Sequence, residues 1–341
     1  MGVRMVDALS CRYRPAMRPS CTWAGMAALA LVSGTGHGSA PRPIECAQQA
    51  DTDSALECGR CHQDNHREWS QGAHAKAWTD PVYQKALLGK PRPDLCHGCH
   101  IPQEVQRRLG KPPQPRQARL ADGVDCVACH RRAGAILGPF GAKTTAHETM
   151  QDPTFAAPGS NALCAACHST KIGPVLPVAR DFEERGLAEQ GKSCTGCHMP
   201  KVDRVIAIDP VTSRPSGPLR SGREHQVLGP GDAAFCAKAF EITLRRDGDE
   251  CILAIANKAG HRVPGLTARK FVVRARQLGD DDREIKKEPA FEITAENELR
   301  VMETREVRFL LAARATKVEV AVDHSLFGKT VATILQRVLQ P

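Results

Sequence analysis

Ten of the 15 cysteines in this chain fall into one pattern, in which two cysteines separated by two residues are followed directly by a histidine. Two thiols at this spacing can bond to the two vinyl groups of one haem, and the next imidazole then reaches the iron. Zinc sites pair cysteines without an obligatory histidine after each pair, and a disulfide framework needs none, so the pattern favours haem. The motifs contain Cys58, Cys61 and His62; Cys96, Cys99 and His100; Cys126, Cys129 and His130; Cys164, Cys167 and His168; and Cys194, Cys197 and His198. The sequence therefore predicts five covalently bound c-type haems, with these five histidines as iron ligands.

The spacing of the motifs indicates an internal duplication. From first cysteine to first cysteine they lie 38, 30, 38 and 30 residues apart, which implies a repeated unit of 68 residues. Local sequence agrees, since Ala73-His74 precedes Asp80–Tyr83 in the first copy and Ala146-His147 precedes Asp152–Phe155 in the second. We therefore expect haems in pairs, with the fifth beginning a third, incomplete unit.

The second axial ligand of each iron decides between electron transfer and catalysis, because a second histidine saturates the iron and an open position can bind a substrate. His74 and His147 occupy matching places in the repeat, and His225 follows the fifth motif after a proline-rich passage, so these three are predicted ligands. His261 lies in a loop between predicted strands, where it is either a fourth ligand or an exposed loop residue. The other histidines outside the motifs and the leader are better explained as solvated or structural: His66, His97 and His324.

At this point the chain resembles the multihaem cytochromes of the cytochrome c-552/4 family. The matching features are Trp69 and His74-Ala75 after the first motif, Pro102 after the second, Gly123-Val124 before the third, Met199-Pro200 after the fifth, Glu224-His225, and the Gly260–Pro264 loop with His261. The resemblance implies a mostly helical haem domain with bis-histidine haems and a role in periplasmic respiratory electron transfer. It also implies that His261 is an iron ligand.

Residues 1–40 have the features of a secretory signal peptide. An arginine-rich stretch, residues 12–18, precedes an apolar run, Trp23–Val32, and small residues through Ala40. Translation from Met17 would give a leader of ordinary proportions. The apolar run is too short to span a bilayer, and no later segment is a better candidate. We expect a periplasmic or otherwise exported protein without a transmembrane anchor in the mature chain.

Charge and composition indicate which partners to expect. The formal charge is +9, but the leader carries several of the arginines, two propionates per haem would offset more, and no run of Lys and Arg forms a basic patch. Nucleic acid is therefore not an expected partner. Aromatic residues make up only 4% of the chain, which is poor material for a core unless porphyrin supplies apolar bulk.

After the leader, the chain divides into two regions with different sequence patterns. Residues 41–228 hold all five motifs between frequent Pro and Gly, which predicts a mainly α haem domain with few short helices and long loops. Residues 229–341 instead show alternating strand patterns over 240–255, 271–275, 307–311 and 318–322, which predict a small all-β, sandwich-like domain. A turn at Asp247-Gly248 would place Cys251 opposite Leu244, too far from Cys236 to form a disulfide.

Two functions follow from this reading. The first is electron transfer through closely packed, mostly bis-histidine haems in a respiratory chain, with other cytochromes or a quinol-oxidising membrane complex as redox partners. The second is an oxidoreductase with one five-coordinate haem that acts on a small nitrogen or sulfur compound. No lysine replaces the histidine of any motif, which removes the clearest sequence mark of a nitrite-reducing haem, and no catalytic residue is assigned.

Overall fold

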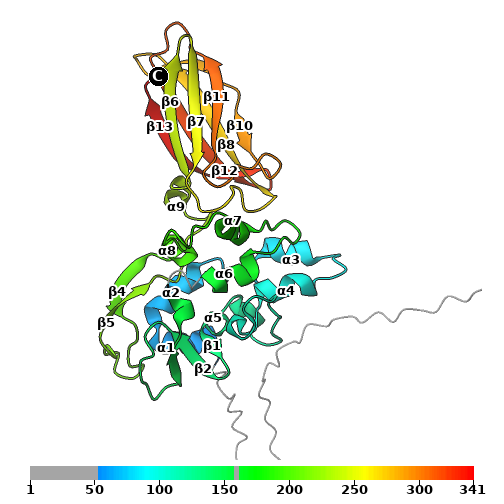
Figure 1. Cartoon of the computed structure of the whole chain (residues 1–341), viewed down its shortest axis with the longest axis vertical. Coiled ribbons are helices and arrows are strands. Elements are labelled where there is room, and N and C mark those ends of the chain that lie inside the picture. Colours follow the sequence, from blue (N-terminus) through cyan, green and yellow to red (C-terminus); the bar gives the residue numbers. More distant parts are fainter. Residues whose placement is uncertain (1–52, 157–160) are drawn as a thin grey trace, which may run out of the picture. The chain divides into compact units, whose positions relative to one another are not determined.

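The computed structural model describes residues 53–156 and 161–341 (Figure 1). These residues all belong to one compact unit, Gln49–Pro341. The predicted signal peptide lies outside the described residues. Among the helices of the described part, none has the length and apolar character that crossing a bilayer requires.

The five motifs all lie on short helices. Three of these helices begin at a polar side chain that accepts a backbone N–H: Ser54 from Glu57, Asp125 from Ala128 and Ser193 from Gly196. Such caps satisfy amides that would otherwise lack a partner at the first turn. The motif helices are α1 (Ala55–Cys61, with His62 as its C-cap), α4 (Asp94–His100), α5 (Cys126–His130), α6 (Asn161–His168) and α8 (Cys194–His198).

The remaining elements of the haem-motif region, which is the described part of residues 53–228, are also short. The other helices are α2 (Gln63–Gln71), α3 (Pro81–Leu87) and α7 (Val178–Glu184), with the 3-10 turns Val105–Arg108, Leu120–Asp122 and Pro153–Phe155. Two small sheets join them: β1 (Arg131–Arg132), β2 (Ala135–Gly138) and β3 (Thr149–Gln151) in one, and β4 (Lys201–Val205) with β5 (Leu219–Arg223) in the other. Short helices followed by a β region agree with the predicted arrangement, whereas these two sheets were not predicted.

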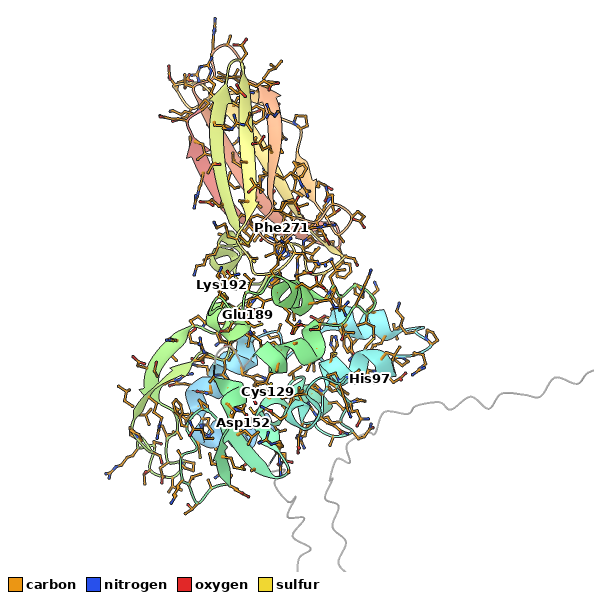
Figure 2. The ribbon with its side chains drawn as sticks, in the orientation of Figure 1. His97, Cys129, Asp152, Glu189, Lys192 and Phe271 are labelled. Carbon is orange, nitrogen blue, oxygen red and sulfur yellow. The ribbon has the colours of Figure 1, made fainter. Side chains whose placement is uncertain are left out.

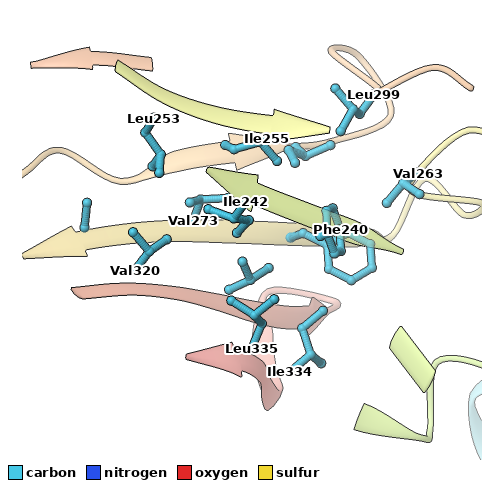
Figure 3. Packing of buried hydrophobic residues seen from close by; sticks show 14 of the residues in the cluster. Phe240, Ile242, Leu253, Ile255, Val263, Val273, Leu299, Val320, Ile334 and Leu335 are labelled. Carbon is cyan, nitrogen blue, oxygen red and sulfur yellow. The ribbon is translucent and has the colours of Figure 1, made fainter. Parts of the chain in front are cut away.

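The C-terminal region is built of two sheets that share one hydrophobic core (Figure 3). After α9 (Ala233–Ala237), one sheet has the order β11-β7-β6 and the other the order β10-β8-β12-β13, with β9 also paired to β8. The bounds are β6 (Phe240–Asp247), β7 (Glu250–Asn257), β8 (Arg269–Leu278), β9 (Glu284–Lys287), β10 (Phe291–Ile293), β11 (Thr304–Leu310), β12 (Lys317–Leu326) and β13 (Lys329–Leu339). Ile255 from the first sheet and Val320 from the second are both fully buried in this core, which is the arrangement of a sandwich.

The first hairpin of the sandwich has a different register from the predicted one. β6 and β7 pair with Asp247 opposite Glu250, so the turn is Gly248-Asp249 and Cys251 lies opposite Arg246 rather than Leu244. Gly248 has a φ of +63°, the conformation that glycine supplies at the first position of a type II′ turn. Cys236 and Cys251 are both free thiols.

Candidate haem-binding site

Each motif presents its residues from about one helical turn. The two cysteines of a motif are three residues apart and therefore lie on one helix face, with the histidine one position further along. None of the cysteines in the described part of the chain forms a disulfide, and Cys197 is the one motif cysteine among them that is exposed. The thiols are thus available for thioether bonds.

Four motif histidines each lie opposite a histidine from elsewhere in the chain. The distances between ring centres are 6.4 Å for His62 and His147, 6.4 Å for His168 and His74, 6.1 Å for His130 and His225, and 6.3 Å for His198 and His261. An imidazole nitrogen binds a metal at about 2 Å, and its ring centre lies about 1 Å further out, so two axial imidazoles on one iron have centres about 6 Å apart. The four pairs have the spacing that a bis-histidine haem requires.

The pairing crosses the internal repeat. His74, from the first copy, lies opposite the histidine of the fourth motif, and His147, from the second copy, lies opposite that of the first motif. The two copies therefore exchange histidines. His225 and His261, which follow the fifth motif, lie opposite the third and fifth motif histidines.

Backbone carbonyls orient most of these rings. Because a carbonyl can only accept a hydrogen bond, the Nδ1 atom next to it must carry the proton, and Nε2 is then free to bind a metal. The Nδ1–carbonyl distances are 3.0 Å for His62 to Ile206, 2.5 Å for His100 to Ala77, 2.8 Å for His130 to Leu137, 2.6 Å for His198 to Leu228, 2.9 Å for His225 to Arg223 and 2.8 Å for His261 to Arg262.

Burial keeps several of the paired histidines neutral, which is the form that binds iron. Burial, with the nearby His168 and His198, lowers the pKa of His74 to about 4. Burial and the nearby His130 lower the pKa of His225 to about 4 as well. Burial also lowers the pKa values of His130, His168 and His261.

An ion pair holds the segment that carries His225. Arg204 donates to both carboxylate oxygens of Glu68, at 2.5 and 2.9 Å, and the same carboxylate accepts the backbone N–H of His225 at 2.8 Å. Burial raises the pKa of Glu68, but the bonds from Arg204 and His225 lower it by more. This contact joins α2, β4 and the His225 loop.

A second ion pair holds the loop that carries His261. Arg262 donates to Asp181 of α7 through its backbone N–H at 3.1 Å and its guanidinium at 2.6 and 2.7 Å, and to Glu298 at 2.8 Å. The backbone N–H of Leu176 also donates to Gly265 at 3.2 Å. These bonds fix the β-region loop against α7 and the segment before it.

His100, in the second motif, is the exception. Among the residues that the structure describes, no histidine ring lies opposite it; instead, the Tyr83 ring stacks on it at 3.6 Å with an interplanar angle of 6°. The Tyr83 hydroxyl is buried without a hydrogen-bond partner, and burial raises its pKa. The remaining histidines are engaged elsewhere: His66 faces Trp69 at 5.5 Å, His97 (labelled in Figure 2) faces Trp78 at 5.1 Å, and His324 faces Phe271 at 5.4 Å.

Contacts between thiols bring different motifs together. The thiols of Cys58 and Cys126 lie close together, as do those of Cys99 and Cys167 and those of Cys164 and Cys194. The first motif is thus next to the third, and the fourth is next to both the second and the fifth. Haems attached to these cysteines would have their edges close together.

Sequence reasoning missed several residues of the site. Tyr83 could have been found from the sequence, since its segment Asp80–Tyr83 recurs as Asp152–Phe155. In the structure Phe155 also stacks on a motif histidine, His130, with ring centres 4.7 Å apart. Glu68, Arg204 and Asp181 could not have been found in this way, because their role depends on residues that lie far away in the sequence.

Part of the chain matches a known protein family, and most of it resembles a solved structure. Residues 57–131 match the family model described as cytochrome c554 and c-prime. A penta-haem cytochrome c552 from Thermochromatium tepidum has a similar structure, with a TM-score of 0.62 and 16% identity over 84% of this chain and 98% of its own. The chicken interferon gamma receptor α chain aligns with a TM-score of 0.20 and 12% identity over 30% of this chain and 49% of its own, too little to indicate a shared fold. No curated protein matches the sequence. The five motifs, the family match and the similar fold together identify the chain as a multihaem c-type cytochrome.

Proposed function

We propose that this cytochrome carries five haems and transfers electrons through them. The four imidazole pairs with centres 6.1 to 6.4 Å apart carry this proposal, because a six-coordinate bis-histidine iron changes its charge without binding a substrate. In this assignment His147, His225, His74 and His261 are the second ligands of the first, third, fourth and fifth haems.

The thiol contacts support a continuous electron path. They place the first motif beside the third, the second beside the fourth, and the fourth beside the fifth. Cys129 of the third motif is also close enough to Cys164 and Cys167 to affect their pKa values, which links the third haem to the fourth. Electrons that enter at either end of this set would need only short steps between neighbouring haems.

The proposal places the protein outside the cytoplasm, where c-type haem is attached and where the predicted signal peptide would direct it. Its redox partners would be other cytochromes or a quinol-oxidising membrane complex.

A second candidate function rests on His100. Its haem would have no second histidine from the part of the chain that the structure describes, so a small molecule could bind its iron. Such a haem could reduce or oxidise a small nitrogen or sulfur compound, with the other four haems supplying or removing electrons.

Electron paramagnetic resonance of the oxidised holoprotein tests both functions, together with a haem count by the pyridine haemochrome assay. We expect five haems per chain, four low-spin and one high-spin. His225→Gly should convert one further haem to high spin, whereas the control His66→Gly should change nothing. Fewer haems, or a low-spin spectrum that His225→Gly leaves intact, would contradict the ligand assignment.

The two functions differ in what the high-spin haem does. Nitrite, hydroxylamine and sulfite are added in turn to the reduced protein. Reoxidation of all five haems with consumption of one of these compounds would favour the enzyme. An unchanged spectrum, or binding without consumption, would favour the electron carrier.

A further inference from the structure

Arg269 and His324 are polar side chains on the inner face of the sandwich that hold buried nitrogens without hydrogen bonds. Along β8, residues alternate between the two faces, and the inner row runs through Phe271, Val273 and Ala275, all buried. Arg269 begins this same inner row. On the neighbouring strand β12, His324 is paired with Phe271 in register and is 3% exposed (Phe271 is labelled in Figure 2).

Neither polar group has a partner that explains its burial. Both ring nitrogens of His324 and the Nε atom of Arg269 are buried without a hydrogen bond. Within residues 53–156 and 161–341, no carboxylate forms an ion pair with Arg269, and the nearby Cys236 is a neutral thiol because burial raises its pKa. A buried imidazole without hydrogen bonds is costly, and a partly buried guanidinium without a counter-ion is also unfavourable. Burial, with the nearby Arg269, lowers the pKa of His324 to about 4, so the ring is neutral and carries one N–H donor.

A series of contacts through α9 links Arg269 to the fifth motif. α9 packs on the sandwich core through Cys236, and the preceding residue, Phe235, has its ring 5.0 Å from the ring of His198. The His198 ring also donates to the carbonyl of Leu228, and the Cys236 thiol donates to the next carbonyl, that of Gly229, at 3.7 Å. Cys236, which Arg269 approaches, is thus within one residue of a contact to the fifth motif histidine.

We propose that Arg269 is the counter-ion of a propionate of the haem bound by Cys194, Cys197 and His198, and that His324 donates a second hydrogen bond to that propionate. This inference rests on the proposed function, since it needs a haem at the fifth motif. A carboxylate is the group that the fork of a guanidinium binds best, and each haem brings two of them. The β region would then tune the haem that it covers, because a positive charge near the iron favours the reduced state.

The test is an EPR-monitored redox titration of the full holoprotein. The signal of the fifth haem is identified first, as the low-spin signal that His261→Gly removes. In Arg269→Met the ratio of reduced to oxidised fifth haem at a fixed potential should fall about tenfold, which is a shift of about 59 mV for a one-electron couple. Arg269→Lys keeps the charge and loses the fork, so its fall should be smaller; it also serves as the readout if Arg269→Met does not fold. His324→Phe, which removes one neutral donor, should also give a smaller fall.

The matched control is Lys270→Met, which removes the same charge from the adjacent residue on the opposite face of β8, where the lysine pairs with Glu292 at 2.6 Å. Its ratio should change less than about twofold, because a solvent-exposed charge is strongly screened. An arginine that merely closed the end of the core would change the unfolding temperature in Arg269→Met and leave the potential alone, and that result would overturn the inference. A shift in the signal of another haem would overturn it too.

If the proposed function itself were wrong, the experiment would give a different result. If the wild-type protein carries no haem at the fifth motif, or if His261→Gly removes no low-spin signal, then the ligand assignment is wrong, and with it the inference. If the haem count and the His261→Gly result are as expected but neither Arg269 variant shifts the potential, only the propionate contact is refuted.

Discussion

The haem-motif region and the sandwich are stabilised in different ways. In the sandwich, buried side chains from both sheets form one continuous apolar cluster around residues such as Ile255 and Val320. In the haem-motif region, the buried apolar side chains of the described residues are scattered. The one cluster that includes them is small, Phe182 and Leu187, and its third member, Val301, comes from the sandwich region. The sandwich can therefore fold through burial of its own side chains, whereas the haem-motif region needs its cofactors as a core.

The lengths of its helices also indicate that the haem-motif region needs its cofactors. The described helices of the haem-motif region have between five and nine residues. Isolated helices this short are unstable in water, because nucleation costs more than a few hydrogen bonds return. Thioether bonds and axial ligands would hold these turns in place.

The largest expected effect comes from depriving the chain of haem. If the chain is produced without haem attachment, residues 55–200 should lose nearly all protection against hydrogen exchange, and the strands of the sandwich should keep theirs. Hydrogen exchange followed by mass spectrometry measures both regions in one sample, with the holoprotein as reference. Protection in the motif helices without haem would show that they have a core of their own.

A smaller effect is expected from a cavity in the sandwich. Ile255→Ala should lower the free energy of unfolding of the sandwich by about 2–5 kcal/mol, because it removes a fully buried side chain from a packed core. The haem absorption spectrum should change little, since His261 is the one assigned iron ligand that comes from the sandwich region. Denaturant unfolding followed by circular dichroism measures the loss.

The control for the cavity is Val331→Ala, at a side chain that is 55% exposed, where the loss should stay below about 1 kcal/mol. A haem spectrum that changes in step with the loss of the strands in Ile255→Ala would show that the two regions unfold as one.

The smallest effect concerns the ion pair beside His225. Glu68→Gln should lower the stability of the holoprotein by about 1–2 kcal/mol at pH 7, because it replaces charge-assisted hydrogen bonds by neutral ones. The pKa of Glu68 is lower in the folded than in the unfolded chain. Such a carboxylate stabilises fully above its unfolded pKa of about 4.3, and its contribution is lost as pH falls through the folded value. The difference from wild type should therefore be constant above about pH 5 and shrink below about pH 4, in denaturant unfolding measured at each pH.

A solvent-exposed ion pair in the sandwich serves as the control for Glu68→Gln. Glu241 forms a solvent-exposed ion pair with Lys258 at 3.1 Å, and Glu241→Gln should cost less than about 0.5 kcal/mol at any pH. Equal losses in the two variants would mean that the Glu68 contact contributes no more than a surface pair.

The sequence predicted the features that depend on local pattern. The alternation that begins at Phe240 located β6 and β7, because a strand shows its period in its own residues. The turn lies one residue later than predicted, which shifts the pairing by two residues, since Asp247-Gly248 and Gly248-Asp249 have the same composition and only strand pairing distinguishes them. β4 and β5 were missed because their sequences, Lys201–Val205 and Leu219–Arg223, show no apolar alternation.

The candidate site was likewise predictable only in its local features. Four histidines could be nominated as second ligands from the repeat, the proline-rich passage and the family resemblance. Their partners could not, because the ring pairs join residues as far apart as His62 and His147, and only the folded chain brings these together. The stacking of Tyr83 on His100 depends equally on tertiary structure.

The exchange of histidines between the two repeat copies has a consequence in time. A growing chain that has presented its first motif does not yet contain His147, and His74 must wait for His168 of the fourth motif. In the proposed ligand assignment, neither of these haems could complete its coordination before the copy that holds the partner histidine has been made. Under this assignment the first and fourth haems would both become six-coordinate only after most of the second copy has emerged.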